Sequence, residues 1–301
     1  MKNGEIVVIG SSNTDMVVKS GHLPSPGETV LGGHFIMNPG GKGANQAVAA
    51  ARLGGAVTFI ANVGDDVFGH EAVKGFQSHG INSDFVGIDK GSPSGIALIM
   101  VDDHGENCIS VALGANAAIQ TADIDRARKV IGQASYVLIQ LEIPIDVVEH
   151  AVELARQADV KVVLNPAPAQ LLSDDILSSL HMITPNEMEA ELLTGIKVDD
   201  EISARSAANA LQEKGIDIVV ITMGSLGAYV LSKELDQLIP CPSVKAVDTT
   251  AAGDTFNGAL VVGLAEGMGL MEAVEFANKA AAFSVTIMGA QASTPSRDDL
   301  N

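Results

Sequence analysis

The chain has 301 residues, 18 of them basic and 37 acidic, which gives a formal net charge of −19 at pH 7. A protein this acidic repels nucleic-acid backbones and anionic membrane surfaces, and the chain has no apolar run long enough to span a bilayer. Because 47% of the residues are hydrophobic and 18% are charged, the chain can fill a core, which excludes a disordered protein. We therefore expect one α/β domain over residues 1–301, with no nucleic-acid or membrane partner.

The apolar runs predict strands that alternate with helices. A strand at 5–10 precedes a helix at 44–53, a strand at 57–63 and a helix at 69–79. From residue 136 onward the alternation is regular, which is typical of a mostly parallel central sheet with helices on both faces. The later strands are predicted at 136–141, 161–165, 182–184 and 217–222, and the later helices at 147–157, 174–179, 187–193, 204–214, 252–266 and 271–286.

Two segments do not fit this sheet. The apolar runs at 96–101 and 107–112 flank a polar, glycine-containing stretch at 102–106, a pattern typical of a β-hairpin. We expect this hairpin, at 95–112, and the early segment 14–38 to form a small β-sheet lid beside the main sheet.

The cysteines and the first residues indicate where the protein works. Cys108 and Cys241 are far apart and lie in no metal-binding or redox pattern. Residues 1–4 lead directly into the first strand without a secretory signal. We therefore expect two free thiols and a cytoplasmic protein.

A glycine-rich turn precedes the first predicted helix. Gly40, Gly41 and Gly43 allow a ligand to approach the backbone closely, and the N-terminus of the helix offers unpaired N–H groups. The turn is not a Walker loop, because Lys42 is followed by glycine. It is either a ligand-binding turn or a tight connection between a strand and a helix.

A second motif lies where the helix at 252–266 begins. Ala251, Ala252 and Gly253 can direct backbone N–H groups at one point, which would form an anion hole at the positive end of the helix dipole. Asp254 follows in the first turn and is a candidate general base for a hydroxyl that attacks phosphorus. The alternative is that Asp254 only stabilises the N-terminus of the helix.

Two further motifs follow predicted strands. Asn186 and Glu189 are three residues apart, so they share one helix face, a spacing that suits a hydrated magnesium ion near phosphates. The alternative is that Asn186 is a helix cap. Residues 222–227 contain two glycines at the carboxyl edge of the sheet, where open α/β sheets bind ligands. This segment lacks the dinucleotide fingerprint, which disfavours a nicotinamide oxidoreductase.

The motifs at 40–46 and 248–256, taken together, resemble the signatures of the ribokinase family of carbohydrate kinases. Residues 10–15, 184–187 and 222–225 support the resemblance, which follows the family's order and covers essentially the whole chain. It implies a ribokinase-like α/β fold and ATP-dependent phosphorylation of a sugar, with the 5-hydroxyl of D-ribose as the first expectation. A kinase for another furanose or for a nucleoside, and a sugar-binding regulator without catalysis, remain as alternatives.

The resemblance also implies roles for single residues. Asp254 would be the base, Ala251, Ala252 and Gly253 the anion hole, and Lys42 would reach the transferred phosphate. The positions implied for sugar binding are Asn13, Thr14, Asp15, Gly41, Lys42, Gly43, Ala44, Asn45, Glu142 and Asp254. The positions implied for ATP are Asn186, Glu189, Thr222, Met223, Gly224, Ser225, Leu226, Gly227, Gly253 and Asn278.

Two cations and a second subunit are implied as well. Magnesium would accompany ATP, with Glu189 near the metal-bound phosphates. A monovalent cation, usually potassium, would be bound beside the anion hole, largely by backbone carbonyls. The implied positions for that cation are Asp248, Thr250, Ser284, Ile287, Gly289 and Ser293. In the family the lid closes over the site and its strands pair between subunits, which implies a homodimer.

Overall fold

The computed structural model describes residues 4–31 and 33–300. Residues 1–3, which belong to the stretch expected to carry no secretory signal, and residue 32 of the expected lid segment lie outside the described residues. Among the described residues, no helix combines the length and apolar character needed to cross a membrane.

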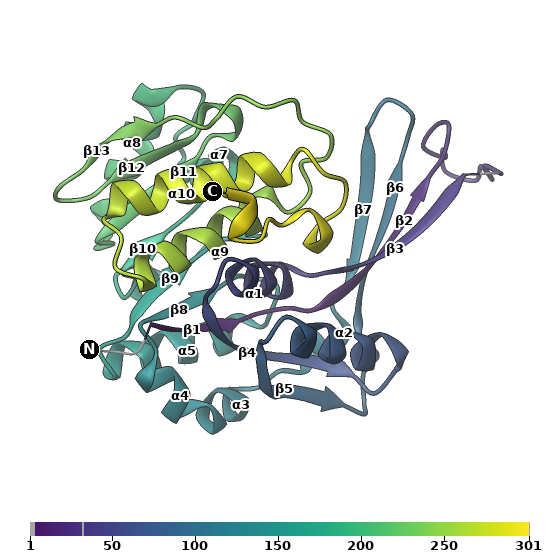
Figure 1. The fold of residues 1–301 in the computed structure, drawn as a ribbon, viewed down its shortest axis with the longest axis horizontal. Helices are drawn as coiled ribbons and strands as arrows, with labels where there is room; N and C mark the ends of the chain where they lie inside the picture. Colours follow the sequence, from purple (N-terminus) through teal and green to yellow (C-terminus); the bar gives the residue numbers. More distant parts are fainter. Residues whose placement is uncertain (1–3, 32, 301) are drawn as a thin grey trace.

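A nine-stranded sheet forms the centre of the described part of the chain (Figure 1). Its strands are β1 (Glu5–Ile9), β4 (Ala56–Gly64), β5 (Asn82–Asp89), β8 (Tyr136–Ile139), β9 (Lys161–Leu164), β10 (Met182–Ile183), β11 (Ile218–Thr222), β12 (Ala228–Leu231) and β13 (Asp236–Ile239). Their spatial order is β13-β12-β11-β10-β9-β8-β1-β4-β5, and only the pairs β11–β12 and β12–β13 are antiparallel.

Helices cover both faces of this sheet, because its strands bury side chains on both sides. In β1, Val7 and Ile9 belong to one core cluster and Ile6 and Val8 to the other. The second cluster contains residues of α1 (Lys42–Arg52), α2 (Val67–Ser78), α9 (Ala252–Ala265) and α10 (Leu270–Ser284). The first contains residues of α3 (Thr121–Arg126), α4 (Arg128–Gln133), α5 (Ile145–Gln157), α6 (Asp174–Leu177), α7 (Glu187–Thr194) and α8 (Glu201–Gln212).

The expected mostly parallel sheet with helices on both faces is confirmed, and each predicted strand and helix overlaps an observed one. Several elements were not predicted. The edge strand β5 mixes polar and apolar residues and is only partly buried, so it gives no continuous apolar run. α3 and α4 have six residues each, too few to establish a helical period.

A second sheet projects from the main body (Figure 1). It has four strands, β2 (Asn13–Lys19), β3 (His34–Gly40), β6 (Gly95–Val101) and β7 (Asn107–Ala112), in the order β3-β2-β6-β7. β6 and β7 are the expected hairpin, and β2 and β3 come from the early segment. The expectation of a small separate sheet beside the main sheet is therefore confirmed.

The topology places a crevice at the carboxyl edge of the main sheet. From β1 the chain goes on to β4 and β5 on one side, and it later returns to β8, which pairs with the other side of β1. The strand order thus reverses between β1 and β8, and such a switch point is where open α/β sheets bind ligands.

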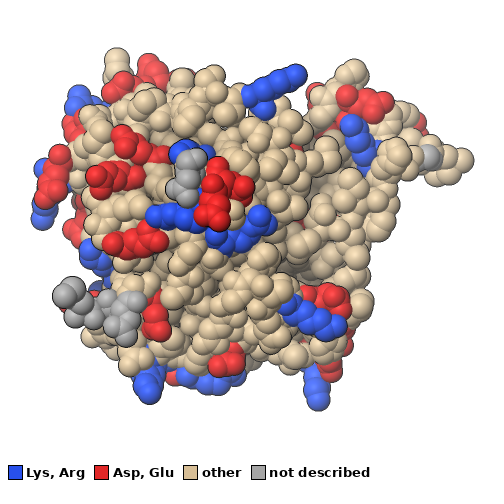
Figure 2. All heavy atoms as spheres, viewed as in Figure 1, with Lys and Arg blue, Asp and Glu red and all other residues tan. Residues whose placement is uncertain are grey.

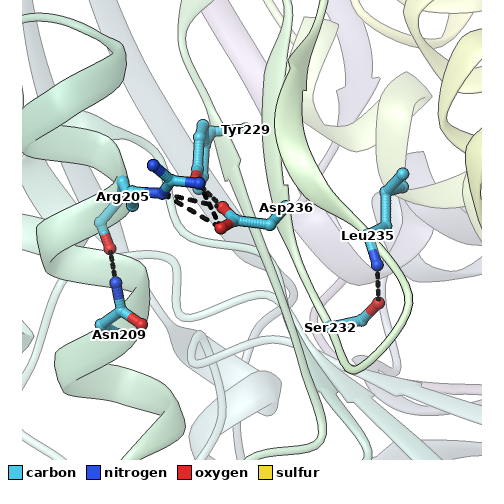
Figure 3. Close-up of polar contacts among 6 residues, drawn as sticks. All are labelled: Arg205, Asn209, Tyr229, Ser232, Leu235 and Asp236. Carbon is cyan, nitrogen blue, oxygen red and sulfur yellow. Dashed lines mark hydrogen bonds and ion pairs between the residues drawn. The ribbon is translucent and has the colours of Figure 1, made fainter.

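A polar cluster holds the antiparallel edge of the sheet to α8 (Figure 3). The guanidinium of Arg205 donates from Nε to both carboxylate oxygens of Asp236 at 3.0 and 3.1 Å, and the hydroxyl of Tyr229 also donates to Asp236. Burial, and then the bond to Asp236, raise the pKa of Tyr229 to about 12. The phenol is therefore a permanent donor at neutral pH, and the cluster is structural.

The start of α1 crosses the end of β1 at very short range. A Cβ added at Gly43 would lie 2.6 Å from the backbone of Gly10 and Ser11. We predict that Gly43→Ala lowers the free energy of unfolding by about 2 kcal/mol, because the two backbones would have to separate. Urea unfolding measures the change.

Gly75 in α2 provides the matched control, because a Cβ there meets no atom of the described residues within 4 Å. Gly75→Ala should raise stability by up to about 1 kcal/mol through helix propensity. Equal effects of the two substitutions would contradict the crossing argument.

Candidate active site

A cavity of about 190 Å³ lies at the carboxyl edge of the central sheet. A larger surface hollow of about 670 Å³, beside α5 and α6, contains none of the predicted site residues. The smaller cavity gathers residues from four of the sequence motifs. The predicted residues that line it are Lys42, Asn186, Glu189, Thr222, Ala251, Ala252, Gly253 and Asp254.

The Asp254 carboxylate is buried, and both of its oxygens are hydrogen-bonded. Asn45 Nδ2 donates to Oδ2 and Gln46 Nε2 donates to Oδ1, both at 2.9 Å. Burial raises the pKa of Asp254, whereas the charge of Lys42 and the two amide hydrogen bonds act in the opposite direction. The site therefore contains a carboxylate of raised basicity that faces the cavity, which is what a general base requires.

α9 begins at Ala252, as predicted, and no side chain of the described residues caps its N-terminus. The residue before it, Ala251, has a φ of 59°, a left-handed conformation that is strained for a residue with a Cβ. This conformation turns the chain sharply into the helix beside the cavity. An uncapped helix N-terminus at a cavity wall attracts a negatively charged group.

Lys42 is the first residue of α1 and is surrounded by carboxylates. Its backbone N–H donates to Glu142 Oε2 at 3.0 Å. Burial opposes the charge of its ammonium group, but the nearby carboxylates of Asp254, Glu142, Glu189 and Asp15 outweigh burial and raise its pKa. Lys42 is therefore a cation in a buried site that otherwise carries negative charge.

The residues expected at the sugar lie where the second sheet leaves the main body. Asn13, Thr14 and Asp15 begin β2, and Gly41, with a φ of 89°, precedes α1. The N–H of Ala44 donates to the carbonyl of Ser11 at 2.8 Å. Burial, and then the charges of Glu142 and Asp254, raise the pKa of Asp15 to about 6.

Asn116 lies beside these residues, but no sequence motif predicted it as a site residue. It is fully buried in a short 3₁₀ segment, Gly114–Ala118, just after β7. Its Nδ2 donates to Asn13 Oδ1 at 2.7 Å, and its Oδ1 accepts from the N–H of Ser12 at 2.8 Å. It therefore orients the amide of Asn13, and the partners are about a hundred residues apart in sequence.

The residues expected at the nucleotide fall into two groups. Asn186 caps α7 and forms a capping box with Glu189, which is the alternative role considered for this pair. Both residues also line the cavity. Thr222 pairs with Asn186 in an isolated bridge. Gly253 also lines the cavity, whereas residues 223–227 and Asn278 do not: residues 223–227 form a turn before β12, and the Asn278 amide donates to the carbonyls of Ile239 and Pro240.

The positions expected at the monovalent cation lie in the loop before α9 and in a second loop with its flanking residues, from the end of α10 to the 3₁₀ segment at 291–293. Asp248 accepts from the N–H of Thr250 at 2.9 Å and from the N–H of Gly289 at 2.8 Å. These hydrogen bonds lower the pKa of Asp248 although partial burial acts against them. Ile287 follows α10 in the second loop, and the hydroxyls of Ser284 and Ser293 donate to backbone carbonyls.

Further polar residues line the cavity, and none of them was predicted as a site residue. Asn165 follows β9 and Thr184 follows β10, while Asn257 lies one turn into α9. Thr184 Oγ1 donates to Asn257 Oδ1 at 2.6 Å. Their position directly after apolar strands was the signal that could have identified the first two.

The fold and this cavity are those of an α/β enzyme in which a base, a lysine and a helix N-terminus face one small polar site. The model of the pfkB family of carbohydrate kinases matches residues 3–297. The chain belongs to this family. The expected membership in the ribokinase-like kinases, and with it the expected phosphotransferase class, is therefore confirmed.

Individual relatives agree with this assignment. The ribokinase of Haemophilus influenzae is 45% identical over 98% of this chain and 96% of that protein. The deoxyribokinase of Salmonella typhi is 37% identical over 99% of this chain and 97% of that protein. The structure of Arabidopsis thaliana ribokinase complexed with ribose and ATP has a TM-score of 0.91 and 31% identity, and it covers 98% of this chain and 97% of that one.

The raised pKa of Asp15 generates a prediction for the carbohydrate substrate. Asp15 is ionised above its pKa of about 6 and becomes protonated as the pH falls through that value. If its carboxylate accepts a hydroxyl proton of the sugar, the KM for the sugar should rise about tenfold between pH 7 and pH 5, in proportion to the ionised fraction. Steady-state kinetics at saturating ATP measure this change.

The variant Asp15→Asn serves as the control, because its amide does not titrate. Its sugar KM should be high and nearly independent of pH in the same range. A KM of the unsubstituted protein that stays constant from pH 7 to pH 5 would show that the Asp15 charge does not contribute to sugar binding.

Proposed function

We propose that the protein transfers the γ-phosphoryl group of ATP to the 5-hydroxyl of D-ribose, giving D-ribose 5-phosphate and ADP. The observation that carries the proposal is the buried carboxylate of Asp254 beside the uncapped N-terminus of α9 and the Lys42 cation. Family membership and the high identity to ribokinases support ribose as the acceptor.

In the proposed reaction these three groups act together on one phosphoryl transfer. Asp254 takes the proton of the 5-hydroxyl as its oxygen attacks phosphorus. The backbone N–H groups of residues 251–253 stabilise the charge on the moving phosphoryl group, and the ammonium of Lys42 adds a fixed positive charge beside it. Closure of the proposed lid over the sugar would exclude water, so that the acceptor is the sugar rather than water.

Magnesium is proposed to accompany ATP. The described residues contain no cluster of three His, Cys, Asp or Glu side chains arranged to hold a metal, so Mg²⁺ would be bound mainly by phosphate and water oxygens. Glu189 fits the role of a nearby carboxylate, because one of its oxygens accepts from the N–H of Asn186 and the other is not used in that bond. When bound, the ion neutralises phosphate charge.

A potassium ion is proposed beside the N-terminus of α9, between the loops that Asp248 connects. The carboxylate of Asp248 and the hydroxyl of Ser293 are hard oxygen ligands of the type that such an ion prefers. Carbonyl groups of Thr250, Ser284, Ile287 and Gly289 would complete the site.

The second sheet is proposed to be a lid that closes over the sugar and mediates a homodimer. Its register aligns four β-branched side chains on one face, one from each strand: Ile36, Val17, Ile99 and Ile109. None of these belongs to either core cluster, and Ile109 is 57% exposed. Figure 2 shows uncharged side chains over the lid strands near the body, whereas charged side chains gather over the helices.

A cytoplasmic location is also proposed. It is supported by the free thiols of Cys108 and Cys241, which reducing conditions maintain.

The proposed reaction predicts ribose-dependent formation of ADP. With ATP, magnesium and potassium, ribose should give the highest kcat/KM in a panel that includes 2-deoxyribose, other pentoses, fructose and nucleosides. Replacing potassium by tetramethylammonium should lower the rate. A coupled ADP assay measures the rates, and mass spectrometry or NMR identifies the phosphorylated hydroxyl.

Asp254→Asn is the control for the base. It should reduce kcat by about 10³-fold or more while it leaves sugar binding measurable, since it removes the proton acceptor but keeps the shape. A preference for 2-deoxyribose or a nucleoside would contradict ribose as the substrate, and an active Asp254→Asn variant would contradict the proposed base.

The lid interface predicts a dimer that a charge disrupts. Ile109→Glu should convert the dimer to a monomer in sedimentation velocity experiments, because it places a carboxylate in the apolar row, at its exposed β7 end. Ile202→Glu on α8 is the matched control, since Ile202 is 77% exposed and lies away from the lid. A monomeric unsubstituted protein would rule out the interface.

A further inference from the structure

The two amides that bind Asp254 must face it with their donor ends. A side-chain amide can rotate by half a turn and exchange its oxygen and nitrogen, so a donor faces a carboxylate reliably only if other partners fix the amide. If Gln46 were reversed, its Oε1 would lie where Nε2 now donates to Asp254 Oδ1 at 2.9 Å. Two acceptors would then face each other inside the protein, and the base would lose one of its hydrogen bonds.

Gln46 is held in the productive orientation from three directions. Both hydrogens of Nε2 are used, one toward Asp254 Oδ1 and one toward Asn165 Oδ1 at 2.9 Å. Asn165 is itself fixed, because its Nδ2 donates to the carbonyl of Thr184 at 3.1 Å. On the other side, Gln46 Oε1 accepts from Gln140 Nε2 at 2.5 Å.

Gln140 makes this contact at a cost to stability. It follows β8 directly and is fully buried. Its own Oε1 has no hydrogen-bond partner among the described residues, and a Cβ on Gly10 would lie 2.1 Å from that oxygen. A buried acceptor without a partner is unfavourable, whereas an apolar side chain of the same length would avoid the penalty. A residue selected for packing alone would not be an amide here.

We propose that Gln140 is a positioning residue of the kinase reaction, which fixes the Gln46 amide so that its donor end faces the Asp254 carboxylate. The proposal rests on the proposed function, because it assigns Asp254 as the base. It adds a residue two positions before Glu142 that acts on the base through its hydrogen bond to Gln46.

A second amide pair on the other side of Asp254 has the same arrangement. Asn45 Nδ2 donates to Asp254 Oδ2, while Asn45 Oδ1 accepts from Gln291 Nε2 at 3.2 Å. Gln291 lies in the 3₁₀ segment Gln291–Ser293. Each carboxylate oxygen thus accepts one amide whose orientation a further amide determines, and the remaining lone pairs are left for the substrate hydroxyl.

The charges around Asp254 define what loss of Gln140 would do. Lys42 stabilises the ionised carboxylate, whereas Glu142, Asp15 and Glu189 are carboxylates that oppose it. Reversal of the Gln46 amide would add another partial negative charge. Asp254 would then be protonated at a higher pH, and a protonated carboxyl group cannot accept the hydroxyl proton.

The test compares two nearly isosteric variants. Gln140→Met removes the donor and the unpaired acceptor, and Gln140→Glu places an acceptor opposite Gln46 Oε1. We expect Gln140→Met to lower kcat about tenfold, with less than a threefold change in the KM for ribose, because one oriented hydrogen bond is lost at the base. The ascending limb of its pH–kcat profile should move up by roughly 0.5 to 1 unit.

Stability distinguishes positioning from a structural role. Gln140→Met should leave the melting temperature unchanged or raise it while activity falls. Gln140→Glu should lower kcat further and shift the ascending limb of the pH–kcat profile in the same direction. If Gln140→Met does not fold, the Gln140→Glu variant provides the test. Asn62→Leu is the matched control: Asn62 is a buried amide of β4 that packs against Gly87, and its loss should leave the pH profile unchanged.

Direct titration of Asp254 separates this proposal from the proposed function. Carbon-13 NMR of the aspartate carboxyl groups, assigned with Asp254→Asn, should show a higher Asp254 pKa in both Gln140 variants, whether or not ribose is phosphorylated. Unchanged Asp254 titration and an unchanged kcat profile in folded Gln140 variants would overturn the positioning role. Absence of ribose-dependent ADP formation by the unsubstituted protein would overturn only the proposed function.

Discussion

The site depends on one electrostatic constraint, which is that a buried carboxylate must stay ionised among other carboxylates. Asp254 shares its surroundings with Asp15, Glu142 and Glu189, and burial raises the pKa of Asp254. Lys42 supplies the balancing charge, and the four carboxylates in turn raise its pKa although it is buried. The amides of Asn45 and Gln46, which donate to the two carboxylate oxygens, also favour the ionised form of Asp254.

The negative net charge of the chain excludes only some anionic ligands. A net charge of −19 argues against extended anionic partners, but it does not prevent the binding of one small anion. The attraction is local: Lys42 and the uncapped N-terminus of α9 face one cavity. The left-handed conformation of Ala251 is the strained connection that brings this helix to the cavity.

Sequence patterns predicted the regular part of the fold well, because a strand buried on both faces must be continuously apolar and a covering helix must be amphipathic. β1 and β8 through β11 follow this rule, and α1 was placed to within two residues at its start. β5 and β12 were not predicted. β5 lies at the edge of the sheet and carries polar residues, and β12 is a four-residue strand that follows a turn.

The sequence by itself determined the alternation of elements and the two motifs at 40–46 and 248–256, since both are properties of neighbouring residues. Only the tertiary structure decided which amides meet. Gln140 and Gln46 are 94 positions apart, and Asn116 and Asn13 are 103 apart. Their contacts follow from the pairing of β1 with β8 and from the point where the second sheet leaves the body. Local periodicity carries no information about such pairs, because strand order and helix packing set the distance between them.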